Sequence, residues 1–332
     1  MSAIHPQAID RPNAPTSVSL EVTLGPLTLR NPVLAASGTY GYGREYEGFI
    51  DNATIGGFVT KSVTPHARRG NRHPRVAETP SGMLNSIGLE NSGIDHFLDH
   101  DWPVVRQEPC LVILSIAATS ADEYFEMCAK AERAGGVQAI EINLSCPNVK
   151  EGGRTFGADP RAVEAILRGC RRETSAYLIA KLTPNADPVA IAAGAEAGGA
   201  HAISLINTLL GMGIDVERRR PLLAMGMGGL SGPAVKPVAL AMTYRVCRAT
   251  KLPVIGMGGI SHWKDAIEFM LAGATAIQVG TALFGNPRVM QEIIAGMEEY
   301  CRRHGIAAIR NLIGTLQGGD VVMEGAKGGA SG

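Results

Sequence analysis

A thiol and two carboxamides lie close together in residues 141–153, which read EINLSCPNVKEGG. Cys146 can act as a nucleophile or a base, and Asn143 and Asn148 can each donate and accept hydrogen bonds. Residues 138–144 have the pattern of a buried parallel strand, and the proline and glycines that follow prevent regular structure from continuing. We interpret the segment as a substrate clamp around a reactive atom at a strand end. The alternative is a small buried cysteine beside asparagines that cap a turn.

Two lysines and several glycines predict a second, phosphate-bearing ligand. Lys61 and Lys181 each follow an apolar run, and a buried ammonium without an anionic partner is costly. The glycine turns at 256–259 and 280–281 each lead into a helical pattern, so their backbone N–H groups can cradle a phosphate, with Gly232 as a further contributor. Without a dinucleotide fingerprint, this set indicates a mononucleotide, and FMN fits because a cation stabilises its anionic reduced ring. The alternatives are lysines that extend to solvent and glycines that only form tight turns.

Eight apolar runs alternate with helical patterns and must position these groups. They are residues 33–36, 57–60, 111–117, 138–144, 178–182, 201–206, 253–257 and 275–279. The alternation predicts an α/β fold, a (β/α)₈ TIM barrel, in which the polar groups above lie at the carboxyl ends of the strands, the catalytic face. A doubly wound sheet is the competing architecture, but it usually needs an early Gly-x-Gly-x-x-Gly turn. The nearest runs here, GMGGLS and GMGGIS, are late and end in serine.

Four further features complete the predicted architecture. Residues 20–24 and 27–30 predict a hairpin around a Gly-Pro turn that caps one end of the barrel. Ser120 predicts the start of a helix that ends near Gly135, and Ser261 precedes a second predicted helix that ends near Gly273. Residues 62–110 and 208–232 are longer than simple connections, so we expect both to lie over the ligand. We expect residues 1–17 to be a flexible tail, 18–316 a single FMN-binding catalytic domain, and 317–332 a glycine-rich tail.

Composition limits the partners. The 332 residues carry 31 lysines and arginines against 31 aspartates and glutamates, so we expect neither nucleic acid nor a membrane surface as partner. The six cysteines form no Cys-x-x-Cys pair, and the histidines are not spaced with carboxylates, so we expect no metal site. Reduced thiols and an amino terminus without an apolar stretch favour a cytoplasmic location without a signal peptide or spanning helix.

The run NLSCPN, residues 143–148, resembles the active-site loop of the dihydroorotate dehydrogenases, specifically the soluble class with cysteine at position 146. The membrane-bound class has serine there. The resemblance covers roughly residues 18–316. It implies FMN-dependent oxidation of dihydroorotate to orotate in pyrimidine biosynthesis, with Cys146 as the base.

The resemblance also implies residue roles. The substrate pocket is formed by Lys61, Asn85, Ser86, Ile87, Gly88, Leu89, Asn143, Asn148, Asn207 and Thr208. FMN is surrounded by Ser37, Lys61, Ser62, Asn143, Lys181, Ile206, Gly232, Gly258, Gly259, Gly280 and Thr281.

The electron acceptor is predicted from two more segments. NVKEGG at 148–153 and GGLSGPAVKPVAL at 228–240 resemble the subclass that passes electrons to a separate iron–sulfur flavoprotein and then to NAD. This implies a homodimeric core with a subunit that carries FAD and an iron–sulfur cluster. Residues 224–227 and 154–155 depart from that subclass. The alternatives are the fumarate-linked homodimeric class, a dihydropyrimidine dehydrogenase-like flavin module and a non-catalytic barrel subunit.

Overall fold

Eight parallel strands close into a barrel in the computed structural model, which describes residues 15, 17–145, 150–151 and 154–318. In chain order the barrel strands are β3 (Val33–Ala35), β4 (Gly57–Val59), β7 (Leu111–Ile116), β8 (Ala139–Asn143), β11 (Tyr177–Lys181), β12 (Ala202–Leu205), β17 (Val254–Met257) and β18 (Ala276–Val279). Each overlaps one of the eight runs identified in the sequence. The TIM-barrel prediction is confirmed, and the doubly wound alternative is wrong because β18 pairs with β3 and closes the sheet.

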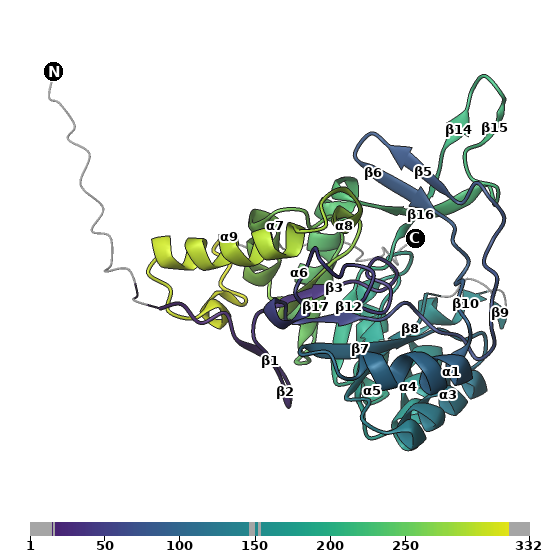
Figure 1. Ribbon diagram of the computed structural model, residues 1–332, viewed down its shortest axis with the longest axis horizontal. Helices are drawn as coiled ribbons and strands as arrows, with labels where there is room; N and C mark the ends of the chain where they lie inside the picture. The colour runs from purple at the N-terminus through teal and green to yellow at the C-terminus, as the bar shows by residue number, and fades with distance from the viewer. Residues whose placement is uncertain (1–14, 16, 146–149, 152–153, 319–332) are drawn as a thin grey trace, which may run out of the picture.

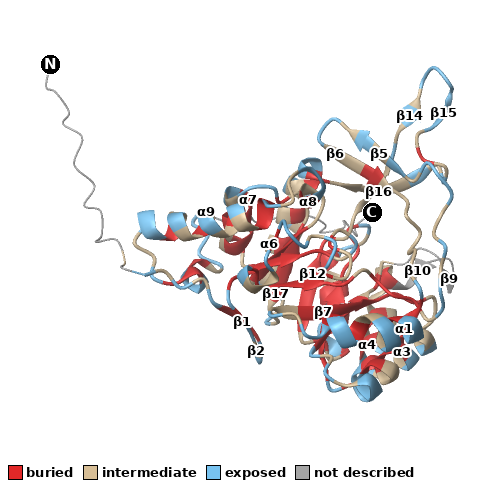
Figure 2. Ribbon diagram, viewed as in Figure 1, coloured by how far each residue is buried: buried red, intermediate tan, exposed pale blue. Residues whose placement is uncertain are grey.

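Helices cover the outside of this barrel, with their buried faces on the strands and their exposed faces toward water (Figures 1 and 2). The longer ones are α3 (Ala121–Ala134), α4 (Pro160–Glu173), α5 (Pro188–Ala197), α6 (Lys236–Ala249), α7 (Trp263–Leu271) and α9 (Val289–Arg303). Shorter pieces are α1 (Ile94–His96), α2 (Trp102–Val105), α8 (Ala282–Gly285), the π-helical turn η2 (Phe97–Asp101), and the 3₁₀ turns η1 (Asn52–Thr54), η3 (Phe156–Ala158), η4 (Pro233–Val235) and η5 (Ile309–Leu312). Among the described residues, none of these helices is long and apolar enough to cross a membrane.

Both predicted helices form, α3 after Ser120 and α7 after Ser261, but only Ser120 is itself the N-cap. Ser120 caps α3 in a reciprocal capping box with Glu123, and Gly135, at φ +74°, ends the helix as expected. Ser261 does not cap α7, because the N-cap is His262, whose ring accepts the Lys264 amide. Ser261 lies one residue too early and instead donates to the side chain of Asp265.

The amino-terminal hairpin consists of β1 (Val22–Leu24) and β2 (Leu27–Leu29), as expected. Its turn residue Gly25 lies against the ring of Tyr177, where an added Cβ would be 2.8 Å from Cε2. Because Tyr177 begins β11, the hairpin covers the amino end of the barrel and leaves the carboxyl end free. The predicted tails, 1–17 and 317–332, fall mostly outside the described residues.

The two long excursions pair with each other. From residues 62–110 come β5 (Val76–Thr79) and β6 (Gly82–Asn85), and from residues 208–232 come β13 (Leu209–Met212) and β16 (Met227–Ser231). They form an antiparallel sheet in the order β13-β16-β6-β5, and the small hairpin of β14 (Ile214–Asp215) and β15 (Arg220–Pro221) extends beyond it (Figure 1). A further small ladder joins β9 (Lys150–Glu151) to β10 (Arg154–Thr155).

Candidate active site

Closure of the barrel brings the polar groups singled out in the sequence to one mouth. Asn143 and Lys181 end β8 and β11 and are partners in register. Ser37, Lys61, Asn207, Gly258 and Gly280 follow the ends of β3, β4, β12, β17 and β18. Parallel strands in a closed barrel all end on the same side, so residues that are distant in sequence share this rim.

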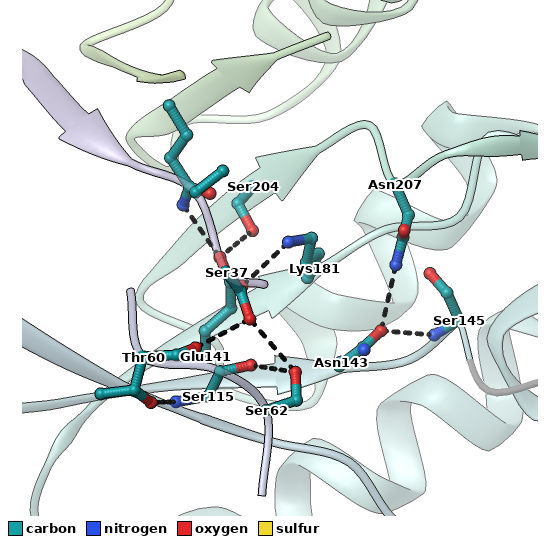
Figure 3. Close-up of polar contacts among 12 residues, drawn as sticks. Ser37, Thr60, Ser62, Ser115, Glu141, Asn143, Ser145, Lys181, Ser204 and Asn207 are labelled. Atoms are coloured by element: carbon teal, nitrogen blue, oxygen red, sulfur yellow. Dashed lines mark hydrogen bonds and ion pairs between the residues drawn. The ribbon is translucent and has the colours of Figure 1, made fainter. Parts of the chain in front are cut away.

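A buried carboxylate that sequence reasoning missed lies just beneath the rim. Glu141, in the middle of β8, is fully buried, and its Oε1 lies 3.2 Å from the Lys181 ammonium (Figure 3). Its Oε2 accepts hydrogen bonds from Ser204 Oγ at 2.9 Å and from Gln278 Nε2 at 2.9 Å. The only signal in the sequence was a glutamate inside an apolar strand, where a charge needs a partner.

Three serines form a second polar chain across neighbouring strands. Ser37 Oγ donates to the Thr60 carbonyl at 2.8 Å and lies 3.2 Å from Ser62 Oγ, which in turn lies 2.7 Å from Ser115 Oγ (Figure 3). Because Ser37 uses its proton on Thr60, Ser62 donates to Ser37 and Ser115 donates to Ser62. Ser115, which was not predicted, thus bonds the predicted residue Ser62, and Ser62 in turn bonds the predicted residue Ser37.

A pair of carboxamides faces the mouth from β8 and the segment after β12. Asn143 Oδ1 accepts from Asn207 Nδ2 at 3.2 Å and from the Ser145 amide at 3.2 Å, while Asn207 Oδ1 accepts the Thr208 amide (Figure 3). The hydroxyl of Tyr124 on α3 donates to the Asn143 carbonyl at 2.6 Å. The Asn143 amide nitrogen has no hydrogen-bond partner among the described residues, so it can donate to a ligand.

Lys61 stands at the same rim with its side chain partly buried. Its backbone amide donates to the Gly41 carbonyl at 2.8 Å. Within the described part of the chain, its ammonium has neither a hydrogen bond nor an ion pair. A partly buried cation of this kind favours an anionic ligand, whereas the Lys181 ammonium already has Glu141.

Asn91, to which sequence reasoning assigned no role, ties Leu89 to Thr64 beyond the end of β4, and Asn71 bonds the carbonyls of Ser86 and Ile87 in the same segment. Asn91 Nδ2 donates to Thr64 Oγ1 and to the Leu89 carbonyl, both at 2.7 Å, and its Oδ1 accepts the amides of Thr64 and Gly93. Leu89 has a φ of +56°, a conformation rare for a leucine. Asn85 joins the sheet above, where it is the register partner of Gly229.

Glycine turns after β16 and β17 approach each other closely. Gly232, Gly258 and Gly259 have φ values of +98°, +126° and +73°. A Cβ on Gly259 would lie 2.8 Å from the Lys236 amide and 2.9 Å from the Gly232 carbonyl. The close approach therefore requires glycine and leaves backbone without side chains at this side of the mouth. Thr281 Oγ1, at the next turn, donates to Ser231 Oγ at 2.8 Å.

Asp265 on α7 fixes this turn region from outside the barrel. Its Oδ2 accepts the amides of Ser261 and His262, both at 2.9 Å, and its Oδ1 pairs with Lys236 at 2.7 Å. Burial raises the pKa of the Asp265 carboxyl, but the hydrogen bonds from Lys236 and the two amides outweigh burial and hold that pKa below its usual value.

Two predicted residues, Cys146 and Asn148, lie outside the described residues. All other predicted site residues are described. Ile206 and Thr208 follow β12 beside Asn207, and Ser86, Ile87 and Gly88 lie between the end of β6 and Leu89.

With this geometry, comparison with known proteins decides the family. A family model described as dihydroorotate dehydrogenase matches residues 19–301. The chain belongs to the dihydroorotate dehydrogenase family. It is therefore an oxidoreductase, and the resemblance drawn from the NLSCPN loop is confirmed.

Similar dihydroorotate dehydrogenases come from several bacteria. A protein of Trichlorobacter lovleyi is 52% identical over 301 residues, which are 90% of this chain and 99% of the relative. Proteins of Bacteroides fragilis and Desulforamulus reducens are 47% and 49% identical, and each alignment covers 90% of this chain and 99% and 98% of the relative. All three are named dihydroorotate dehydrogenase B (NAD(+)), catalytic subunit.

Asp265→Asn tests whether the dehydrogenase depends on this carboxylate to hold its glycine turns. We expect the free energy of unfolding to fall by about 1–3 kcal/mol at pH 7, because the lysine and the amides lose a charged acceptor. The folded pKa is lowered, so the stabilisation is complete above the usual value of about 3.9 and is lost as the pH falls through the folded pKa. Urea titrations of wild type and Asp265→Asn at several pH values measure the difference in the free energy of unfolding.

The matched control is Asp122→Asn on α3, an exposed aspartate, which should change stability by no more than about 0.5 kcal/mol. A difference between wild type and Asp265→Asn that stays constant from pH 7 to strongly acidic pH would contradict the assignment.

Proposed function

We propose that this chain oxidises dihydroorotate to orotate with FMN as its bound cofactor, as a step of pyrimidine biosynthesis. The observation that carries the proposal is the mouth at which Lys61, Asn143, Lys181 and Asn207 converge from four separate strands, within a chain of this family. Cations, amide donors and bare backbone at one rim suit a planar anionic substrate beside a phosphate-bearing ring cofactor.

The residues present fit FMN. The glycine turns at 232 and 258–259 have no side chains of their own and positive φ values, so their backbone N–H groups suit a phosphate. Lys181 supplies a buried ammonium that suits the pyrimidine end of a flavin ring. We assign to the FMN site Ser37, Lys61, Ser62, Asn143, Lys181, Ile206, Gly232, Gly258, Gly259, Gly280 and Thr281.

Dihydroorotate carries a carboxylate and ring carbonyl groups, which need a cation and hydrogen-bond donors. The Lys61 ammonium and the Asn143 amide nitrogen have no partners among the described residues, and both lie at the mouth. Asn207 holds the Asn143 oxygen and thereby fixes the direction of its amide. We assign to the substrate pocket Lys61, Asn85, Ser86, Ile87, Gly88, Leu89, Asn143, Asn148, Asn207 and Thr208.

The reaction removes a proton from one ring carbon and a hydride from its neighbour. We propose Cys146, three residues after Asn143, as the base that takes the proton, which requires its thiolate form. FMN held by the residues named above would supply the hydride acceptor. Lys61 and the asparagines orient the substrate so that both bonds can break from one bound position.

The visible spectrum of the purified chain tests this proposal. We expect a flavin spectrum that bleaches when dihydroorotate is added without oxygen. Cys146→Ala is the matched variant: it should keep the flavin but slow its reduction by about 100-fold or more in rapid mixing, because a general base has been removed. A purified chain that binds no FMN, or a variant reduced as fast as wild type, would reject the proposal.

The physiological acceptor and the assembly extend the proposal. The chain's relatives are named as catalytic subunits, which implies a partner subunit for them. Residues 209–227 expose six large apolar side chains: Leu210, Met212, Ile214, Val216, Met225 and Met227. Leu210 and Met212 lie on one strand, and Met212 pairs with Met227. Exposed apolar side chains gathered in one excursion favour an assembly, and we propose a homodimeric core with a subunit that carries FAD and an iron–sulfur cluster.

A cytoplasmic location suits such a redox assembly. The described cysteines, at 110, 128, 170, 247 and 301, are free thiols, which suits a reducing compartment. Within the described residues, no group of histidine, cysteine and acidic side chains could hold a metal ion, so the cluster in this proposal belongs to the partner.

Acceptor assays test the assembly. The isolated chain should oxidise dihydroorotate with artificial dyes but reduce NAD negligibly, and addition of the iron–sulfur flavoprotein should restore NAD reduction. The reason is that a flavin in a barrel needs a docked redox centre to pass electrons onward. Rapid turnover of the isolated chain with fumarate would favour the homodimeric class instead, and rapid NAD reduction without a partner would contradict the division of labour.

A further inference from the structure

The carboxylate of Glu141 has no place in the reaction outlined above, yet it is the most completely buried charge of the barrel interior. None of its surface is exposed, and the side chain of Lys181 is only 8% exposed. Three other strands each send one donor to it, from Lys181 on β11, Ser204 on β12 and Gln278 on β18. All three donors in this network are directed at a single acceptor group.

The donors divide the two carboxylate oxygens between them. The neutral donors Ser204 and Gln278 both bind Oε2, which fixes the rotation of the carboxylate. Oε1 accepts only from Lys181 among the described residues. Gln278 Oε1 is buried and has no partner in the described part of the chain, so the polar contact of this amide is with Glu141. The arrangement directs one oxygen toward the lysine.

Register places the carboxylate one layer below the mouth. Glu141 is level with Ile179, whereas Asn143 is level with Lys181 at the strand ends. Residues two apart on a strand point to the same side, so Glu141 and Asn143 both face the interior, with Glu141 deeper. Lys181 is therefore bonded from below. Its ammonium has three N–H donors, Glu141 takes one, and no other described residue takes the remaining two.

Stability alone does not require such a pair. Barrel interiors are normally filled with branched apolar residues, and replacing a buried ion pair with apolar side chains is often neutral or stabilising. Removing only the carboxylate is different, because it leaves the buried Lys181 ammonium without its ionic partner. Glu141 therefore holds the Lys181 ammonium in position at the mouth.

We infer that Glu141 is a positioning residue that holds the Lys181 ammonium in place and directs it at the flavin ring, an inference that rests on the proposed FMN site. Two N–H donors of the lysine are thereby left for the ring. An ammonium held there favours the anionic reduced flavin, so Glu141 raises the midpoint potential of the flavin through Lys181.

The midpoint potential of bound FMN tests this inference in four proteins: wild type, Glu141→Gln, Lys181→Met and the double variant. Glu141→Gln should lower the ratio of reduced to oxidised flavin at a fixed potential about tenfold or more, which is about 30 mV for a two-electron couple. Lys181→Met should also lower it. In the Lys181→Met background, Glu141→Gln should change the ratio by no more than about twofold, because the residue through which it acts is gone.

The matched control is Glu132→Gln on α3. Glu132 also accepts three hydrogen bonds, from Thr174 Oγ1 and from the amide and hydroxyl of Ser175, but these residues precede β11 at the opposite end of the barrel. The midpoint potential of FMN bound to Glu132→Gln should equal that of FMN bound to wild type. If Glu141→Gln does not fold by circular dichroism, Ser204→Ala replaces it, and a smaller decrease is expected because the carboxylate loses one holding bond.

Several results would overturn the inference. They are an unchanged potential in Glu141→Gln or its substitute, a raised potential, or an equal shift in both backgrounds. If wild type still binds FMN and dihydroorotate still reduces it, each of these results leaves the proposed function standing. A wild-type chain that binds no FMN would instead reject the proposed function itself.

Discussion

A carboxylate buried in the centre of a barrel is the constraint on which this site depends. Glu141 must be compensated, and the compensation comes from Lys181, Ser204 and Gln278 on three other strands. These bonds can form together only if the barrel closes with its observed register. The polar network therefore ties the strand register to the mouth, where Lys181 and Asn143 are neighbours.

The rest of the mouth is built by segments that are distant in sequence. The excursions that follow β4 and β12 pair as one antiparallel sheet, so Asn85 and Gly229 are register partners above the barrel. On the other side, Asp265 holds the turn after β17 from outside. Rigid strands below and cross-linked loops above can fix ligand groups more firmly than independent loops.

Much of this was predictable from sequence because the signals are local. Apolar runs between helical patterns predicted all eight strands, and the polar residues that follow these runs predicted the groups at the mouth. Glu141, Ser115 and Asn91 were missed, because each depends on a hydrogen-bond partner in a distant segment, between 27 and 137 positions away. The pairing of the two excursions was missed for the same reason, since strand register between distant segments leaves no periodic pattern. His262 rather than Ser261 caps α7 because Asp265 completes a capping box only from His262.

A crystal structure of the protein with bound FMN would test the central claim most directly. The account predicts that the flavin ring lies at the carboxyl-end mouth, with Lys181 Nζ within hydrogen-bonding distance of a polar ring atom and still bonded to Glu141. The phosphate should lie against the turns at 232 and 258–259. A flavin bound elsewhere, or a Lys181 ammonium that points away from the ring, would contradict the account.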